Sequence, residues 1–157
     1  MFCPLICPYI FESMNTILLL LCTFSVMIAN SQESKPGDSI NYYINLQLNK
    51  GTSSKSISGK KSTRLITYLK ESKEIVIIDV FGTKRLNRKM FYFSKSGDLI
   101  KLIVFAPIKG EDEMRKSQYY IIKGQAFYND GYDLKGKEIT SLIKKASKVY
   151  LKAKNVI

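Results

Sequence analysis

The middle of this sequence is a series of short apolar segments, separated by links that are glycine-rich or polar. The segment Ile75–Phe81 (IVIIDVF) is β-branched for most of its length and apolar on both sides apart from Asp79. Short segments of this composition are typical of β-strands. Because the links are too short for crossover connections, neighbouring strands must pair in antiparallel fashion. The middle of the chain therefore predicts an antiparallel meander, with Ile75–Phe81 as a central strand covered on both faces.

Further segments extend this meander on either side. Ile40–Leu48 alternates between an apolar side and a side carrying Asn, Tyr and Gln, which predicts a half-buried strand. Asn49–Ser62 is rich in Gly, Ser and Lys and predicts a loop. Arg64–Lys70 fits either a strand or one helical face, and the β-branched segment that follows it favours a strand. The remaining strands are expected at Met90–Phe93, Leu99–Ala106, Gln118–Ile122 and Gln125–Tyr128, with tight turns at Gly97 and Gly124.

The C-terminal segment Glu138–Ala153 changes to a helical period. Its apolar residues fall on one face, and its lysines fall on the outer side. Such a helix must bury its apolar face, and one face of the sheet is the natural place. The sequence thus predicts an α+β fold: a mainly antiparallel meander of about six to seven strands, with a C-terminal amphipathic helix packed on one sheet face.

The uncharged apolar block Thr16–Ala29 precedes this region. It is too short to span a membrane comfortably as a helix and is typical of the apolar core of a signal peptide. Small residues at Ala29 and Ser31 predict cleavage before Gln32. No Lys or Arg precedes the block, so Met14 is an alternative start of the leader.

We therefore expect residues 1–31 to be a signal peptide and residues 32–157 to form a single β-rich domain. The mature protein is expected to be secreted or periplasmic, with no stable membrane span once the leader is removed.

The charge of the chain is strongly positive. Its 25 Lys and Arg outnumber 13 Asp and Glu, and loss of the leader with Glu12 raises the formal net charge from +12 to +13. Only four of the basic residues are arginines, the residues that recognise phosphate in a fixed fork. A lysine-dominated excess favours loose attraction to anionic surfaces over specific nucleic-acid recognition.

Two absences bear on catalysis. The chain has no histidine, and its three cysteines, Cys3, Cys7 and Cys22, all lie within the expected leader. The mature domain therefore lacks the usual proton shuttle near neutral pH and every thiol nucleophile or ligand. With no complete metal, nucleotide or nucleophile motif either, we expect a non-catalytic protein without cofactor or metal.

The best candidate for a binding site is the basic cluster Lys84, Arg85, Arg88 and Lys89, which we expect in the link between two strands. It would bind an anionic glycolipid, a polyanion or an acidic partner protein. The alternative interpretation is a solvated turn that keeps sheet edges from pairing.

The hypothesis that follows is an exported, non-catalytic binding or interaction module with a basic surface. Two alternatives stay open. A small hydrolase could use carboxylates such as Asp79 or the acidic run Glu111–Glu113. A lipid carrier would need an apolar cavity between the sheet and the helix.

Two hairpins carry a loose resemblance to a group of bacterial proteins. The segments Tyr92–Leu99 (YFSKSGDL) and Tyr119–Gly124 (YYIIKG), together with the leader ending in Ala29-Asn30-Ser31-Gln32, resemble those of small, uncharacterised exported β-hairpin proteins of Bacteroidota-type bacteria. The second hairpin departs from the first because no Leu follows its turn. The resemblance implies residence in the periplasm or at the cell surface and transfers no functional residue.

Overall fold

The computed structural model describes residues 36–82, 87–108 and 114–157, which belong to one compact unit. Its elements follow one another as α2 (Pro36–Leu48), β1 (Thr52–Ser58), β2 (Ser62–Leu69), β3 (Ile75–Gly82), β4 (Arg88–Phe93), β5 (Leu99–Pro107), β6 (Met114–Ile122), β7 (Gln125–Gly131) and α3 (Gly136–Lys154). The seven strands form one sheet in sequence order, and every neighbouring pair is antiparallel. The predicted α+β meander is confirmed.

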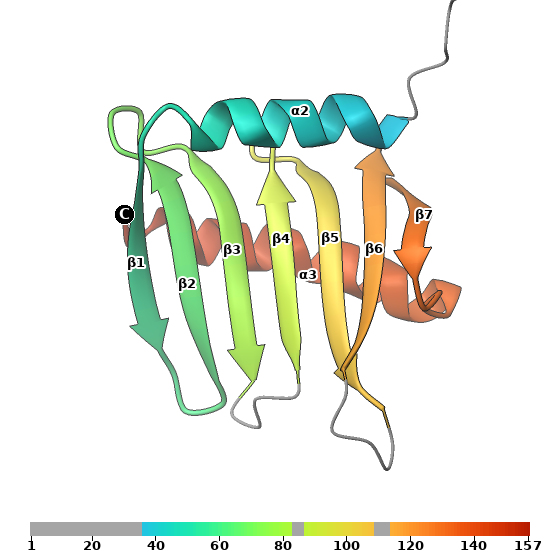
Figure 1. Cartoon of the computed structure of the whole chain (residues 1–157). Helices are drawn as coiled ribbons and strands as arrows, with labels where there is room; N and C mark the ends of the chain where they lie inside the picture. Colours follow the sequence, from blue (N-terminus) through green and yellow to red (C-terminus); the bar gives the residue numbers. More distant parts are fainter. Residues whose placement is uncertain (1–35, 83–86, 109–113) are drawn as a thin grey trace, which may run out of the picture. The chain divides into compact units, whose positions relative to one another are not determined.

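One helix lies on each side of the sheet. In Figure 1, α3 passes behind the strands, whereas α2 lies across their upper end. Between β3 and α3, and between β3 and α2, residues are in contact, so the predicted central strand has a helix against each face. The helix predicted at 138–153 is confirmed as α3, which is slightly longer at both ends.

The core is the face of the sheet beneath α3. Its centre is a row of directly opposed residues on five neighbouring strands, each no more than 2% exposed: Ile66, Ile78, Phe91, Leu102 and Tyr119. The helix covers this row with its apolar face, which includes Ala146 and Val149. Since each buried aliphatic or aromatic side chain contributes about 1.5–3 kcal/mol, this row is a main source of stability.

A smaller cluster holds α2 against the opposite face. Ile44 is buried with Tyr92 and Ile103. The helix begins in close contact with the sheet, because a Cβ added to Gly37 would lie 2.3 Å from the ring of Tyr120. Only glycine permits this approach.

Polar contacts complete the attachment of α2. The Asn41 amide donates to Tyr120 Oη at 2.7 Å, and Lys101 Nζ donates to Asn41 Oδ1 at 2.7 Å. The Lys101 ammonium also lies 5.4 and 5.5 Å from the ring centroids of Tyr92 and Tyr120. Burial lowers the pKa of Lys101, and the nearby charge of Lys116 lowers it further. The helix is therefore fixed by a half-buried lysine as well as by apolar contact.

The strand predicted at Ile40–Leu48 is wrong, because these residues belong to α2. Apolar residues at every second position include an i, i+4, i+8 set, which is also one face of a helix. That set packs on the sheet, while Tyr42 and Leu46 are left 71% and 45% exposed. Pro36 in the first turn, followed by Asp38, favours a helix start and could have indicated it.

The loop predicted at Asn49–Ser62 is also wrong, since Thr52–Ser58 forms the edge strand β1. Its side chains are polar apart from Ile57, so the strand carries no alternating apolar pattern. It pairs with β2 through the backbone, and Ser54 Oγ lies 3.2 Å from Thr67 Oγ1 across the pair. A polar strand at a sheet edge discourages pairing with other chains. The strand favoured for Arg64–Lys70 is confirmed as β2.

The link between β7 and α3 depends on the buried hydroxyl of Tyr119. This hydroxyl accepts a hydrogen bond from the backbone N–H of Leu134 and donates to Asp133 Oδ1 at 3.0 Å. Burial raises the pKa of Tyr119 to about 12, and Asp133 adds to the rise.

We predict that Tyr119→Phe lowers the free energy of unfolding by about 1–3 kcal/mol at pH 7, because a buried hydrogen-bonded hydroxyl is lost. The folded pKa of Tyr119 lies above its unfolded value of 10.0. Its contribution is therefore fully present below pH 10 and lost as the pH rises towards 12. Urea unfolding at pH 7 and pH 11 measures the free energy of unfolding of both proteins. The difference in this free energy between wild type and Tyr119→Phe should be smaller at pH 11 than at pH 7. Tyr42→Phe, at an exposed position, is the control and should change stability at neither pH.

Candidate functional site

The structure separates the residues of the predicted basic cluster. Arg88 and Lys89 lie in β4, which corrects their expected place in the link before that strand. Since successive residues of a strand point to opposite faces, Arg88 lies on the α2 side of the sheet and Lys89 on the α3 side. Lys84 and Arg85 lie outside the described residues. A single anion site made by all four remains a prediction.

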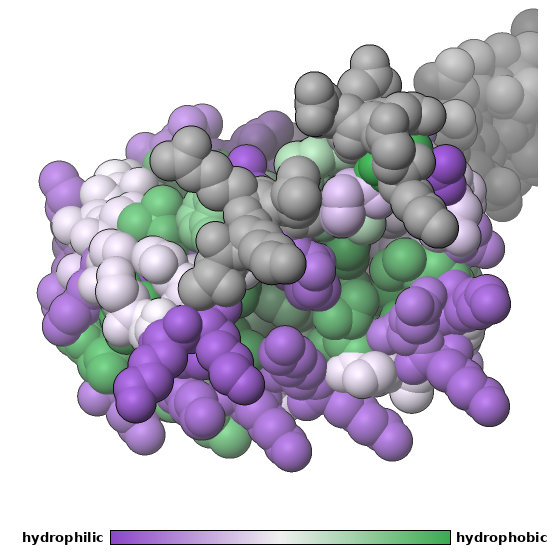
Figure 2. Space-filling model, turned by 90° about the horizontal axis from the view of Figure 1, so that it is seen from below, coloured by the Kyte–Doolittle hydropathy of each residue, from purple (hydrophilic) through white to green (hydrophobic). Residues whose placement is uncertain are grey.

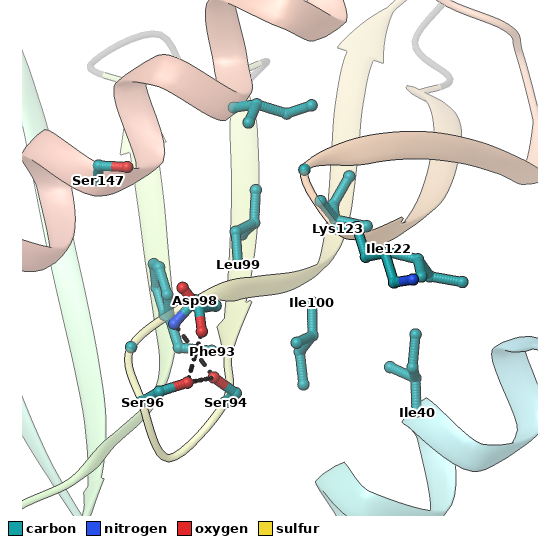
Figure 3. Close-up of a pocket in the computed structure, with 14 residues that line it drawn as sticks. Ile40, Phe93, Ser94, Ser96, Asp98, Leu99, Ile100, Ile122, Lys123 and Ser147 are labelled. Carbon is teal, nitrogen blue, oxygen red and sulfur yellow. Dashed lines mark hydrogen bonds between the residues drawn. The ribbon is translucent and has the colours of Figure 1, made fainter.

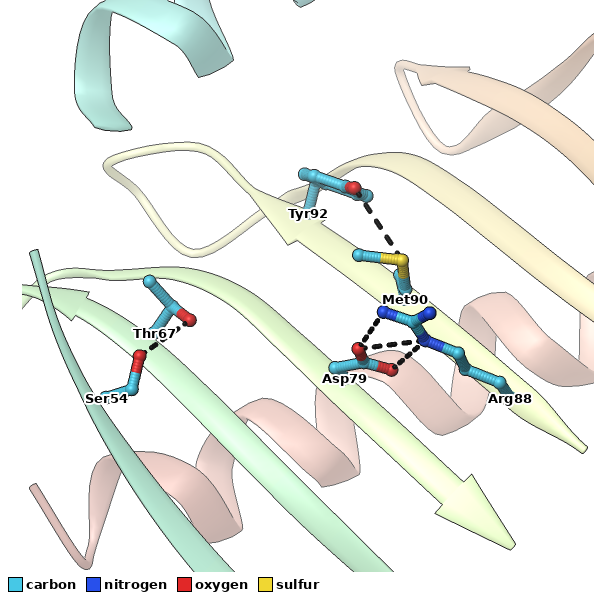
Figure 4. Close-up of polar contacts among 6 residues, drawn as sticks. All are labelled: Ser54, Thr67, Asp79, Arg88, Met90 and Tyr92. Carbon is cyan, nitrogen blue, oxygen red and sulfur yellow. Dashed lines mark hydrogen bonds and ion pairs between the residues drawn. The ribbon is translucent and has the colours of Figure 1, made fainter. Parts of the chain in front are cut away.

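Arg88 is engaged with a carboxylate from the neighbouring strand. Its Nη2 lies 2.6 Å from Asp79 Oδ2, and its Nε lies 3.1 Å from Oδ1 and 3.0 Å from Oδ2. Figure 4 shows this pair on the face of the sheet opposite α3. The guanidinium also lies 5.1 and 5.4 Å from the ring centroids of Phe81 and Phe105. The hydrogen bond to Asp79 raises the pKa of Arg88. The positive charge is therefore neutralised locally, which favours a structural role.

The same pair bears on the hydrolase hypothesis. The Asp79 side chain is 6% exposed and accepts the guanidinium fork. A buried carboxylate with both oxygens engaged by one guanidinium forms a structural ion pair and is not free to contact a substrate. The acidic run Glu111–Glu113 lies outside the described residues. Asp79 thus gives the hydrolase hypothesis no support.

We predict that Arg88→Met lowers the free energy of unfolding by about 3–5 kcal/mol, because Asp79 becomes an unpaired buried charge. The double variant Asp79→Leu/Arg88→Met should recover most of that loss, since apolar side chains of similar size can replace a buried pair. Urea unfolding of the wild type, the two single variants and the double variant measures the coupling. If the double variant is as unstable as the sum of both single variants, the pair is not the reason for the loss.

Lys89 projects into the region between the sheet and α3. It opposes Val80 on one side and Val104 on the other. Burial lowers its pKa, and the like charge of Lys145 on α3 lowers it further. With Lys137 it borders a hollow of about 450 Å³ at the lower end of the sheet. Lys89 therefore adjoins the basic surface of α3.

That surface is a single row of lysines along α3, which we term the lysine stripe. With 100° between successive residues, its members fall within roughly a quarter of the helix circumference, opposite the buried face. All are exposed. They are Lys137, Lys144, Lys145, Lys148 and Lys152. In Figure 2, long hydrophilic side chains project side by side along the edge of the molecule that α3 covers, next to apolar residues of the strand ends.

The lysine stripe carries a cost for the helix. None of its members forms an ion pair within the described part of the chain. Lys144, Lys148 and Lys152 are spaced four residues apart, so their charges repel by about 0.2–0.5 kcal/mol for each adjacent pair. Lys137 lies at the positive N-terminal end of the helix dipole, which is unfavourable for a cation. The sequence pattern places four of these lysines on the outer face of the expected helix, namely Lys144, Lys145, Lys148 and Lys152. It does not include Lys137, because the helix begins at Gly136 and not at Glu138 as expected. The spacing of the four was visible in the sequence, but they were not identified as a site.

The other end of the sheet holds a cleft of about 730 Å³. Its walls come from the β4–β5 and β6–β7 turns, from Ile40 of α2 and from Ile143 of α3. Figure 3 shows the apolar residues Leu99, Ile100 and Ile122 around this space. Tight turns shape its rim, because Gly97 and Gly124 have φ values of 87° and 77°, as predicted for both hairpins. The sequence could not reveal the cleft, since its walls are far apart along the chain.

The lipid-carrier hypothesis expected a cavity between the sheet and the helix. The centre of that interface is filled by side chains, because Ile78, Leu102 and Ala146 are each 0% exposed. The cleft opens instead at the end of the interface, between the strand ends and both helices.

Two further observations concern the described residues. No helix within residues 36–82, 87–108 and 114–157 is long and apolar enough to cross a membrane. Across the same ranges, no group of three acidic or thiol side chains could hold a metal ion.

A scan against protein-family models, a search of curated proteins and a search of solved structures find no match for this chain.

Proposed function

We propose that this protein is an exported, non-catalytic binding module that docks through the lysine stripe of α3 onto an anionic component of the cell envelope or an acidic partner protein. The observation that carries the proposal is the row of five exposed lysines without a carboxylate partner among the described residues. The repulsion within this row costs helix stability, and an anionic partner would relieve it.

The chemistry of the lysine stripe indicates the kind of partner. Lysine ammonium groups are hydrated point charges that attract an anionic surface without a fixed hydrogen-bond geometry. Each contributes about 1 kcal/mol near an anionic lipid surface. Five on one side of a rigid helix, with Lys89 beside them, would bind a charged surface or polymer in a salt-dependent way.

The expected leader supports the compartment in this proposal. The apolar block Thr16–Ala29 predicts export, and a chain without histidine and with no cysteine after Cys22 is poorly equipped for catalysis. After export, a strongly basic domain would be in the same compartment as the anionic lipids and glycans of the cell envelope.

We predict that Lys148→Glu weakens binding to vesicles containing phosphatidylglycerol about tenfold or more at low salt, because two units of charge change at the middle of the lysine stripe. The same change should leave thermal stability equal or raise it, since the introduced carboxylate would lie one helical turn from both Lys144 and Lys152. Vesicle co-sedimentation at 50 and 500 mM NaCl measures the first effect, and a thermal melt measures the second.

Lys60→Glu is the matched control, because Lys60 is an exposed residue of the β1–β2 turn. Figure 1 shows this turn below the strands, away from α3. It changes net charge equally and should weaken binding much less. A soluble polyanion tested beside the vesicles distinguishes a polymer partner from a lipid surface. Equal losses of vesicle affinity in Lys148→Glu and Lys60→Glu would mean that net charge alone, and not the lysine stripe, controls binding.

A further inference from the structure

We propose that the cleft between the two hairpin turns and the two helices binds the hydrocarbon chain of an anionic single-chain amphiphile, with Lys123 holding its headgroup. This site is separate from the lysine stripe, and the inference does not depend on the function proposed above.

The walls of the cleft are suited to a hydrocarbon chain. They carry Ile40 from α2, Leu99 and Ile100 from β5, Ile122 from β6 and Ile143 from α3. All five are only partly buried, although the neighbouring core is filled. A space of about 730 Å³ is within the usual range for ligand sites. Covering five partly exposed apolar side chains would give an apolar ligand a hydrophobic driving force.

A second hollow continues the cleft beneath α2. It has a volume of about 220 Å³ and shares Ile40, Ser94 and Ile100 with the larger space. Ser39 and Tyr43 of α2 also line it. Because the two hollows share these three residues they adjoin each other, so a linear chain could extend from one into the other.

Some polar side chains of the cleft rim already bond to one another, and one does not. Ser94, Ser96 and Asp98 are linked to one another, since Ser96 Oγ donates to Asp98 Oδ2 at 2.5 Å and lies 2.7 Å from Ser94 Oγ. Figure 3 shows this linked group at the opposite side of the cleft from Lys123. The Lys123 side chain forms no ion pair with any described residue. Its ammonium is therefore the group available for an anionic head.

The backbone fixes Lys123 at this rim. Lys123 and Gly124 occupy consecutive positions of the β6–β7 turn with positive φ values of 51° and 77°. This turn geometry is stable with glycine at the second position and costs energy for lysine at the first. Asparagine would suit the first position better, so the presence of a lysine there is consistent with a role for its charge.

The experiment measures binding of dodecanoate to the mature chain by calorimetry, below the concentration at which dodecanoate aggregates. Dodecanol supplies the same chain without charge, and dodecyl phosphate supplies a different anionic head. We expect wild type to bind both anions more tightly than dodecanol. Tighter binding of the phosphate would assign the site to a phospholipid-derived amphiphile, and tighter binding of the carboxylate would assign it to a free fatty acid.

Two substitutions separate the chain site from the head site. Ser147→Trp places a large ring at the α3 wall of the cleft, at an exposed position, and should abolish binding of all three ligands. Lys123→Asn keeps a residue that tolerates positive φ. It should lower the affinity for both anions about tenfold and leave the affinity for dodecanol unchanged. A thermal melt of each variant checks that the fold is intact. If Ser147→Trp unfolds the chain, ligand-induced NMR shifts of the Ile40, Ile100 and Ile143 methyl groups in wild type decide the location instead.

Absence of dodecanoate binding to wild type, or methyl shifts confined to other isoleucines, would overturn the inference. Equal affinity for dodecanol and dodecanoate in wild type would overturn the role of Lys123. Lys148→Glu, outside the cleft, should bind dodecanoate as wild type does, whereas Ser147→Trp should still bind anionic vesicles. The failure of either proposal can therefore be recognised without the other.

Discussion

The contact between α3 and the central row of the sheet is the interaction on which the rest of the molecule depends. Five strands contribute one buried residue each to that row, from Ile66 to Tyr119, and Ala146 and Val149 cover it. Once this face of α3 is buried, the opposite face has to point into water. The lysine stripe is therefore held rigid and exposed by the same contact that stabilises the fold.

The two faces of the sheet use charge in different ways. On the α2 side, Arg88 is tied to buried Asp79, and Lys101 is held by Asn41 between two tyrosine rings, so both cations serve the structure. On the α3 side, the lysines of the stripe form no ion pair with any described residue. The α3 helix thus gathers five exposed lysines on one side, although exposed lysines such as Lys60 and Lys123 also occur elsewhere.

The accuracy of the sequence predictions depended on where each segment obtains its stability. Ile75–Phe81 and Glu138–Ala153 carry strong apolar patterns, and both were correct because burial of those patterns dominates their energy. Ile40–Leu48 satisfies both the strand and the helix period, and the local pattern could not decide between them. Thr52–Ser58 is stabilised by backbone pairing at an edge, which leaves almost no apolar trace in the sequence.

The sequence by itself determined the meander, the C-terminal helix, its outward lysines and the two glycine turns, because each depends on residues that are close along the chain. Only the tertiary structure decided which basic residues are free. Arg88 and Lys89 are adjacent in sequence, yet the pleat of β4 sends them to opposite faces, and the partner of Arg88 comes from another strand. The cleft likewise exists only because α2, α3 and two hairpin turns meet at one end of the sheet. Contacts between distant segments depend on the geometry of the whole fold, and no local pattern of residues contains them.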